Sequence, residues 1–330
     1  MATEPSDSAE LVLAFLAEAG DEVVSGEAIS DKLGLTRAAV WKHVNALRAR
    51  GYRIDAVPAR GYRLAEVPDR LTALELRPLL NTHDLGQVLH AYEELASTND
   101  RARELAEEGA AHGEVVIAER QTAGRGRRGR AWISPARKNL YFSAILRPDL
   151  PTARAPEVTL VASLAVCDVL RQAGVDAGIK WPNDVLAGGR KIAGILTELA
   201  AEPDRVHWIV VGVGVNVNAR AEDFPDDLRG EATSVLLERG EPAPRALFAA
   251  ACLTALEGWL DVHEEQGFGP IREAWRERSV TLGREVRVRV DDGELAGTAE
   301  DIDEAGALLV RTASGLERVL AGDVRLLRPR

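Results

Sequence analysis

Apolar residues in the first 66 positions recur first at helical spacing and then at every second position. The helical spacing predicts three short helices, at residues 9–19, 25–33 and 36–50. Ser25 and Thr36 are of the type that caps helix N-termini, and Gly34 ends the second helix. The alternating runs 52–57 and 61–64 then predict a two-stranded hairpin. Three helices followed by a hairpin are typical of a winged helix-turn-helix.

The third predicted helix carries a polar stripe beside its apolar one, and a stripe of this kind can enter the major groove of DNA. The candidate DNA contacts on this helix, its N-cap and the hairpin are Thr36, Arg37, Trp41, Lys42, Asn45, Arg48 and Arg60. Arg53 and Arg63 on the hairpin are also placed to meet phosphates. A merely solvated basic face is the plainer alternative.

Charge sharpens this prediction because it is not uniform along the chain. The formal net charge is −11, from 41 Lys and Arg against 52 Asp and Glu, which on average argues against nucleic-acid binding. Residues 31–65 nevertheless hold eight basic and two acidic residues, and residues 120–138 hold seven basic and none acidic. The remainder carries −24. Two compact basic islands therefore lie in an acidic chain, and the first coincides with the predicted winged helix.

The middle of the chain mixes strands and helices. We predict strands at residues 88–92, 115–119, 139–146, 192–199 and 206–217, and helices at residues 97–108, 155–173, 245–266 and 271–278. Thr72 and Glu75 have the spacing of a capping box, and Gly188-Gly189 between two apolar runs predicts a hairpin turn. The pattern favours a mixed sheet flanked by helices over a repeating βαβ array.

The last fifty residues change to short alternating runs at 285–290, 295–302, 307–311 and 316–320. Turn residues separate them, beginning with Asp292-Gly293, and strands at this spacing indicate a small β-barrel. The whole chain is thus predicted to be an α+β protein with three domains, at residues 1–66, 67–279 and 280–330.

The second basic island contains a glycine-arginine loop, residues 121–130, directly after a predicted strand. Gly124, Gly126 and Gly129 fit the dinucleotide-binding pattern G-x-G-x-x-G. We reject that site because Pro135 prevents the required helix. Four arginines in the loop can instead close over a strong anion such as a nucleoside triphosphate. From the loop alone, a surface loop and an RNA-binding tract remain alternative interpretations.

Lysine is scarce in this chain, which uses Arg for 36 of its 41 basic residues. Lys180, in the run Lys-Trp-Pro-Asn-Asp, and Lys191 lie within twelve positions of each other. A Lys kept in so Arg-rich a chain indicates a need for a compact ammonium group, although an ordinary surface Lys is the alternative. Ser97-Thr98-Asn99, at a strand-to-helix junction, favours polar or anionic ligand groups, with helix capping as the alternative.

In this order, the runs 97–99, 121–130, 180–184, 191–196 and 212–216 resemble the biotin-protein ligases. With the winged helix, the chain is similar to the bifunctional form that also represses the biotin operon. The resemblance implies a class II synthetase-like, biotin-lipoate ligase fold for the central domain and an SH3-like C-terminal domain. It implies that ATP activates biotin to biotinoyl-5′-AMP, from which biotin passes to a lysine of a biotin carboxyl carrier protein. Such chemistry needs positive charge rather than a protein nucleophile.

The resemblance also implies roles for individual residues. The catalytic residues would be Lys180, Arg125 and Arg127. Biotin contacts would come from Ser97, Thr98, Asn99, Gln121, Gly124, Arg125, Gly126, Arg127, Lys180, Gly194 and Gly212. Contacts to ATP or the adenylate would come from Arg125, Arg127, Arg128, Trp132, Lys180, Asn183, Asp184, Lys191 and Asn216. Magnesium is expected with ATP, and no protein metal site is predicted. Phe224 is the one aromatic residue between positions 218 and 233, so the adenine-stacking residue stays open.

The expected partners are the carrier protein, operator DNA and a second copy of the chain, in a dimer linked to the adenylate. The apolar strand 206–217 is a candidate edge for that dimer. No apolar run reaches the 18 to 20 residues that span a membrane, and Glu4, Asp7 and Glu10 stand where a signal peptide would be basic and then apolar, so we expect a cytoplasmic protein. Two alternatives remain: a metabolite-sensing regulator without catalysis, and a lipoate ligase.

Overall fold

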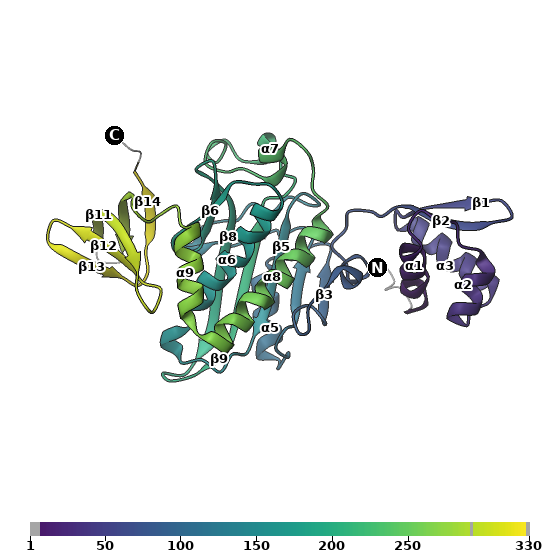
Figure 1. Ribbon diagram of the computed structural model, residues 1–330, viewed down its shortest axis with the longest axis horizontal. Helices are drawn as coiled ribbons and strands as arrows, with labels where there is room; N and C mark the ends of the chain where they lie inside the picture. Colours follow the sequence, from purple (N-terminus) through teal and green to yellow (C-terminus); the bar gives the residue numbers. More distant parts are fainter. Residues whose placement is uncertain (1–6, 291–292, 328–330) are drawn as a thin grey trace. The chain divides into compact units, whose positions relative to one another are not determined.

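The computed structural model describes residues 7–290 and 293–327, and the chain divides into two compact units, Met1–Arg70 and Leu71–Arg330 (Figure 1). Each unit is described by itself. Glu4 and the predicted turn residue Asp292 lie outside the described ranges.

The smaller unit is the predicted winged helix-turn-helix. It contains α1 (Asp7–Glu18), α2 (Gly26–Leu33), α3 (Arg37–Ala49), β1 (Arg53–Val57) and β2 (Gly61–Glu66). Ser25 and Thr36 cap α2 and α3 as predicted, because each side chain accepts a backbone N–H three residues further on. Gly61 allows β2 to lie close to the segment just before α2, since a Cβ on Gly61 would lie 1.9 Å from the carbonyl oxygen of Val24. The apolar stripe of α3 is fully buried against the other helices.

The larger unit is built on a mixed seven-stranded sheet. Its strands are β3 (Leu89–Tyr92), β4 (Val115–Ala118), β5 (Leu140–Leu146), β6 (Ala177–Lys180), β7 (Asp184–Ala187), β8 (Arg190–Ala201) and β9 (Val206–Val215). Their order is β3-β4-β5-β9-β8-β7-β6, with β3 and β4 parallel and every other pair antiparallel. The predicted hairpin turn is confirmed, since Ala187 pairs with Arg190 across it.

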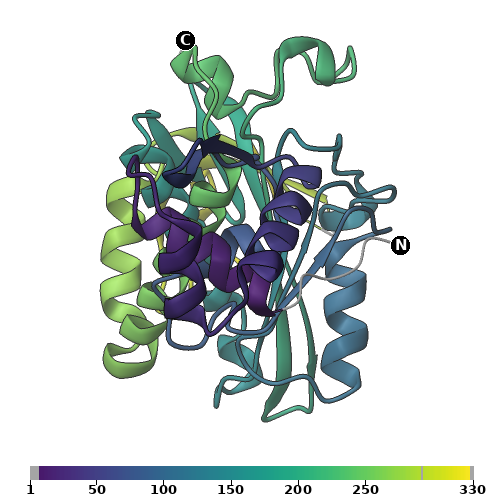
Figure 2. The same ribbon diagram turned by 90° about the vertical axis from the view of Figure 1, so that its right-hand side faces the viewer.

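Helices cover both faces of this sheet. They are α5 (Thr98–Glu107) on one face, and α6 (Pro156–Gln172), α8 (Arg245–Gln266) and α9 (Phe268–Arg278) on the other. The alternation of β4 explains the two layers, because Val115 and Ile117 join the core under α6 and α8 whereas Val116 joins a smaller core under α5. Figure 2 shows the strands between α5 and α8.

A second, five-stranded antiparallel sheet forms the C-terminal part of this unit. Its strands are β10 (Glu285–Val290), β11 (Gly293–Ile302), β12 (Leu308–Thr312), β13 (Gly315–Val319) and β14 (Asp323–Leu326), in the order β13-β12-β11-β10-β14. The first four were predicted, and β14, a run of four residues, was missed. The β-rich domain is confirmed.

Two local predictions were wrong. Strand β9 lies between β5 and β8 in the centre of the sheet, so it offers no free edge. Thr72 precedes α4 (Ala73–Leu76), but its side chain makes no cap hydrogen bond and contacts the Glu75 carboxylate instead of completing a capping box.

Both cysteines, Cys167 and Cys252, are buried and free. Burial raises the pKa of the Cys167 thiol to about 11. In the described part of the chain, no helix is both long and apolar enough to cross a membrane.

Candidate functional site

An open cavity of about 1310 Å³ lies in the larger unit, between one end of the seven-stranded sheet and the C-terminal sheet. All but two of the seventeen residues predicted to contact a small ligand line it: Ser97, Thr98, Asn99, Gln121, Arg125, Gly126, Arg127, Trp132, Lys180, Asn183, Asp184, Lys191, Gly194, Gly212 and Asn216. Arg128 is exposed outside this lining. Gly124 is buried beneath it, where a Cβ would lie 2.6 Å from the Trp132 carbonyl oxygen.

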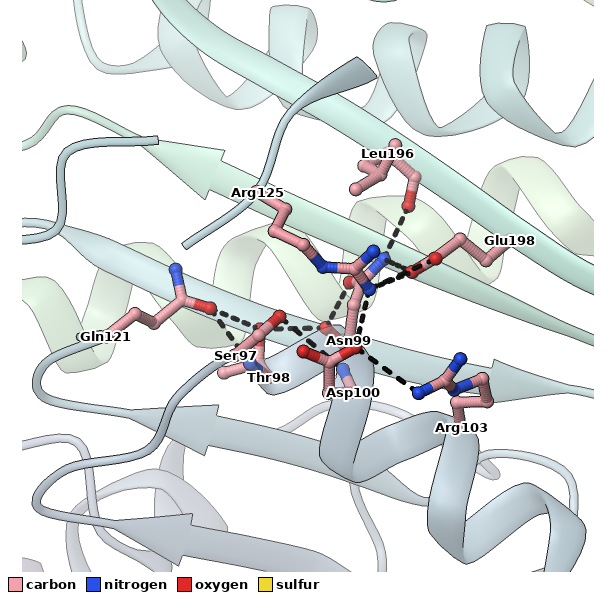
Figure 3. A network of polar contacts seen from close by, with 10 residues as sticks. Ser97, Thr98, Asn99, Asp100, Arg103, Gln121, Arg125, Leu196 and Glu198 are labelled. Carbon is pink, nitrogen blue, oxygen red and sulfur yellow. Dashed lines mark hydrogen bonds and ion pairs between the residues drawn. The ribbon is translucent and has the colours of Figure 1, made fainter. Parts of the chain in front are cut away.

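The N-terminal turn of α5 forms one polar wall of the cavity (Figure 3). The Ser97 hydroxyl caps the helix by accepting the N–H of Asp100 at 3.4 Å, so the capping alternative is realised for that residue. The side-chain oxygen of Gln121, Oε1, accepts from both the backbone N–H of Thr98, at 2.8 Å, and the Thr98 hydroxyl, at 3.1 Å. Ser134 in turn accepts from Gln121 Nε2 at 2.9 Å. The start of the glycine-arginine loop is thereby fastened to the helix.

Asn99 is almost fully buried, and its side-chain amide is satisfied by the chain itself. Its nitrogen donates to the Leu196 carbonyl at 3.1 Å and to Glu198 at 2.8 Å, and its oxygen accepts from Ser143 at 2.7 Å. Gly212 provides the space, since a Cβ at that position of β9 would lie 1.9 Å from Asn99 Oδ1. The glycine therefore leaves room for the Asn99 side chain.

Arg125 is held by two carboxylates that the sequence analysis did not single out. Its Nη2 lies 2.5 Å from Asp100 Oδ1 and 3.1 Å from Glu198 Oε1 (Figure 3). Asp100 is in the first turn of α5, and Glu198 follows the predicted 191–196 motif by two residues. Position in the first helical turn was the one signal for Asp100, and nothing in the sequence distinguished Glu198 from the other acidic residues.

Asp184 holds the two lysines that the sequence singled out. Its carboxylate lies 3.0 Å from Lys180 Nζ and 2.6 Å from Lys191 Nζ. Burial alone would raise the pKa of Asp184, but the ammonium groups of Lys191 and Lys180 outweigh it and hold the pKa below its ordinary value. Two ammonium groups beside one carboxylate leave a net positive charge at the cavity wall, as an anionic ligand requires.

Trp132 lies flat against the sheet at the positions of two glycines. A Cβ on Gly214 would lie 2.5 Å from the indole, and one on Gly194 would lie 3.1 Å from it. Lys191 Nζ stands 5.2 Å from the ring centroid, within cation–π range. The indole Nε1 is buried with no hydrogen-bond partner among the described residues. Trp132 thus offers an aromatic surface beside the lysines, whereas Phe224 is itself buried at the cavity wall.

The far end of the glycine-arginine loop contacts the C-terminal sheet. Arg127 Nη1 donates to Asn183 Oδ1 at 3.1 Å and to the Gly322 carbonyl at 3.2 Å, and Arg130 pairs with Asp323 at 2.5 Å. This loop, the β6–β7 turn and the C-terminal sheet therefore meet at one side of the cavity. Asn216, at its base, is held by Asn139 and by the Thr233 carbonyl.

The predicted DNA contacts fall into two groups within the smaller unit. Trp41 has 60% of its surface exposed, and Arg37, Lys42 and Arg60 are also exposed. The side chains of three others have partners in the unit itself: Thr36 caps α3, and Arg48 donates to the Ile54 carbonyl and to Asn45. The exposed group is the surface that a nucleic acid can reach.

The fold and the site define a class: a DNA-binding winged helix joined to a domain with a cation-lined, nucleotide-sized cavity. Residues 92–216 match the Biotin/lipoate A/B protein ligase family, residues 9–63 an HTH domain, and residues 281–327 the Biotin protein ligase C terminal domain. The chain is 41% identical to the bifunctional ligase/repressor BirA of Bacillus subtilis, over 96% of this chain and 97% of that protein. It is 34% identical to the protein of that name from Escherichia coli, over 93% and 94%. The chain belongs to the biotin protein ligase family, in its bifunctional ligase/repressor form.

A solved structure agrees with this assignment. The biotin protein ligase of Aquifex aeolicus, in complex with biotin and ATP, matches 74% of this chain and all of its own, with a TM-score of 0.64 and 30% identity. The chain is also 39% identical to the biotin–[acetyl-CoA-carboxylase] ligase of Mycobacterium tuberculosis, over 66% of this chain and 80% of that one.

Proposed function

We propose that this protein activates biotin with ATP to biotinoyl-5′-AMP, transfers biotin to one lysine of a biotin carboxyl carrier protein, and binds operator DNA as a repressor of biotin genes. The arrangement of Lys180 and Lys191 around Asp184 carries the ligase proposal, because it places fixed positive charge in a cavity that can hold a nucleotide and a second ligand. We assign the ligand contacts as the resemblance implies them, with Lys180, Arg125 and Arg127 as the catalytic residues.

The first step joins an anion to a polyanion. The biotin carboxylate attacks the α-phosphorus of ATP, the bond to the bridging oxygen breaks, and pyrophosphate leaves with the electron pair. Repulsion between the reactants and charge on the phosphoryl oxygens are the main barriers, and fixed ammonium and guanidinium groups lower both. Lys180 and Lys191 supply this charge from the sheet, and Arg127 supplies it from the loop.

The second step needs protection from water, because a mixed anhydride hydrolyses readily. The glycine-arginine loop runs from Gln121, at the α5 wall, to Arg130, at the C-terminal sheet, and so passes along the cavity. A covered site excludes water and strengthens every charge contact inside it. The carrier lysine then attacks the biotinoyl carbonyl, and AMP leaves.

Magnesium accompanies ATP in this proposal. Mg²⁺ keeps several waters and binds through one or two carboxylates with substrate phosphates, so it needs no dedicated protein cage. Among the described residues no group of three or more His, Cys, Asp or Glu could hold the ion, so the ATP phosphates and water would be its main ligands. The bound ion would neutralise phosphate charge.

Incubation with biotin, Mg-ATP and a biotin carrier domain tests the ligase proposal. We expect one carrier lysine to be labelled and pyrophosphate to appear. A folded protein that releases no pyrophosphate with biotin would be a metabolite-sensing regulator. If lipoate is adenylated in preference to biotin, the protein is a lipoate ligase.

The repressor proposal adds a dimer linked to the adenylate. Strand β8 pairs with β7 only at residues 190–194, so its residues 197–201 have no strand neighbour on that side in the described part of the chain. Leu199 in this stretch is 43% exposed. A free strand edge invites pairing with a second copy, so we place the dimer edge on β8 in place of β9. Sedimentation with and without biotin and ATP tests this assignment.

We place the DNA-binding domain at residues 1–66, the ligase domain at 67–279 and the C-terminal domain at 280–330. Strand β2 ends at Glu66, α9 ends at Arg278 and β10 begins at Glu285, which supports these limits. ATP, carrier protein and operator DNA are all intracellular, so we expect the protein in the cytoplasm.

A further inference from the structure

Glu198 joins two parts of the proposed biotin site that come from different elements. One of its carboxylate oxygens accepts from Asn99 Nδ2 at 2.8 Å. Both carboxylate oxygens of Glu198 lie within 3.2 Å of Arg125 Nη2 (Figure 3). Its side chain is 25% exposed and, among the described residues, it is not part of the cavity lining. A single carboxylate on β8 therefore contacts both the first turn of α5 and the glycine-arginine loop.

The contact with Asn99 sets the direction of that side chain. A carboxylate only accepts hydrogen bonds, so it must face the nitrogen of the Asn99 amide. The amide oxygen is then turned to the Ser143 hydroxyl, which also lies 2.8 Å from Thr98 Oγ1. The reversed amide would place its oxygen against both Glu198 and the Leu196 carbonyl. Glu198 thus orders a buried chain of hydrogen bonds that ends at the cavity wall.

The contact with Arg125 fixes the loop against the same helix. Asp100 and Glu198 approach the guanidinium from α5 and β8, at 2.5 and 3.1 Å. An isolated surface ion pair contributes little, but a guanidinium shared by two carboxylates loses more of its freedom. The loop and the helix turn are consequently held in one arrangement by Glu198.

We propose that Glu198 is a positioning residue for biotin, acting through Asn99 and Arg125 without touching the ligand. The proposal rests on the proposed function, because it takes the wall formed by α5 and the loop to be the biotin side of the cavity. Its effect on ATP should be smaller, because Arg125 is the one proposed ATP contact that Glu198 touches, whereas the other proposed contacts lie mainly at Trp132 and the lysines.

Glu198→Gln in the full-length protein tests the proposal. The amide nitrogen must replace one acceptor, so it places a donor against Arg125 or against Asn99, and in both orientations the negative charge beside Arg125 is lost. We expect the Kd for biotin, from calorimetry without ATP, to rise about tenfold, the change that corresponds to one hydrogen bond to a charged group. In pyrophosphate release, the KM for biotin should rise by a similar factor, and the KM for ATP should rise by less.

Three variants serve as controls. Glu202→Gln makes the same change next to the end of the same strand, on an exposed carboxylate that pairs with His207, and should leave every constant unchanged. Glu198→Asp keeps the charge and should restore part of the affinity. Asp100→Asn frees Arg125 without touching Asn99, so a smaller effect than that of Glu198→Gln places the larger share on Asn99.

The outcomes separate the two proposals. Wild-type protein that binds no biotin overturns the proposed function and this inference with it. Wild-type protein that binds biotin normally, beside a Glu198→Gln variant of equal affinity, overturns the inference alone. Equal losses toward biotin and ATP, or a lowered melting temperature with unchanged affinity for biotin, identify a structural role and also overturn it.

Discussion

At the scale of single residues, the site is organised by carboxylates that hold its cations. Asp184 holds Lys180 and Lys191, and Asp100 with Glu198 holds Arg125. A cation fixed before the reaction needs no reorganisation when charge develops on the phosphoryl group. Lys180 and Lys191 lie in strands β6 and β8, whereas arginines such as Arg127 lie in the glycine-arginine loop.

Replacement of Lys180 by Ala should slow adenylation. Loss of one preorganised charge-stabilising group commonly costs about 100- to 1000-fold in rate. The rate of pyrophosphate release at saturating biotin and ATP measures the effect. Lys138→Ala is the matched control, because Lys138 also lies 3.0 Å from a carboxylate, that of Asp223, but is outside the cavity lining. An unchanged rate for Lys180→Ala would contradict its assigned role.

Replacement of Gly214 by Ala should disturb nucleotide binding. The new Cβ would lie 2.5 Å from the Trp132 indole, whose rigid ring must then move, and such overpacking costs about 1 to 3 kcal/mol. We expect the KM for ATP to rise more than that for biotin. Gly269→Ala, at a position of α9 with open space and outside the cavity lining, is the control and should behave as the wild type.

Residues with rare chemistry were predictable from the sequence, and their partners were not. The lysines, the arginine loop and the glycines stood out against the composition, and the cavity collects nearly all of them. Ser143, Asp100 and Glu198 are common residue types in ordinary strand or helix positions. Their role depends on which elements become neighbours, and Glu198 meets Asn99 across 99 positions of sequence.

At the scale of elements, a buried ion pair anchors the segments that border the cavity. Arg245, the first residue of α8, lies 2.6 Å from Glu119 at the end of β4, and both are almost fully buried. Glu119 also accepts the backbone N–H of Leu71, and Arg245 donates to the carbonyl of Asn139. The pair therefore holds both ends of the segment that contains the glycine-arginine loop.

Replacement of Arg245 by Met should destabilise the protein strongly. It leaves the buried Glu119 carboxylate without its main counter-charge, and breaking a buried pair in this way costs about 3 to 5 kcal/mol. The midpoint of urea unfolding gives the change. Arg239→Met, which removes a partly exposed Arg paired with Glu241, should shift the midpoint little. Equal shifts for the two variants would show that burial of the pair is unimportant.

The acid stability of the protein should depend on Glu157. Burial alone would raise the pKa of this α6 carboxyl, but His263 and Arg154 outweigh it and hold the pKa below its ordinary value of 4.5. The carboxylate therefore stabilises the fold above about pH 4.5, and this contribution is lost as the pH falls through the lower folded-state pKa. We expect the free energy of unfolding to fall with acidification less steeply in Glu157→Gln than in the wild type. Parallel pH profiles would refute the role.

Elements with a repeated pattern or a cap were predictable, whereas one short strand was not. Helix α8 has the predicted bounds, Ser25 and Thr36 cap the helices that they were expected to cap, and Ser97 realises the capping alternative. Strand β14 was missed, although β3 and β4, with four residues each like β14, were predicted. The position of β9 in the sheet was also beyond prediction, because strand order depends on long-range pairing.

At the scale of the whole molecule, charge is divided between units that differ in their partners. The smaller unit carries a basic stretch, whereas the chain as a whole is acidic. We expect residues 71–330 to retain biotinylation of the carrier and to lose operator binding, because each unit has its own core. Gel-shift and labelling assays on the same preparation measure both, and loss of both activities would assign the smaller unit a structural role.

The burial of both native thiols makes this chain convenient for site-specific spectroscopy. Cys167 and Cys252 are shielded from solvent, and at neutral pH the Cys167 thiol is protonated and poorly reactive. If Arg128 in the exposed loop is replaced by Cys, a maleimide fluorophore should therefore attach at that position alone. The native thiols need not be removed. The emission of that single dye during mixing with biotin and ATP would follow the loop in real time.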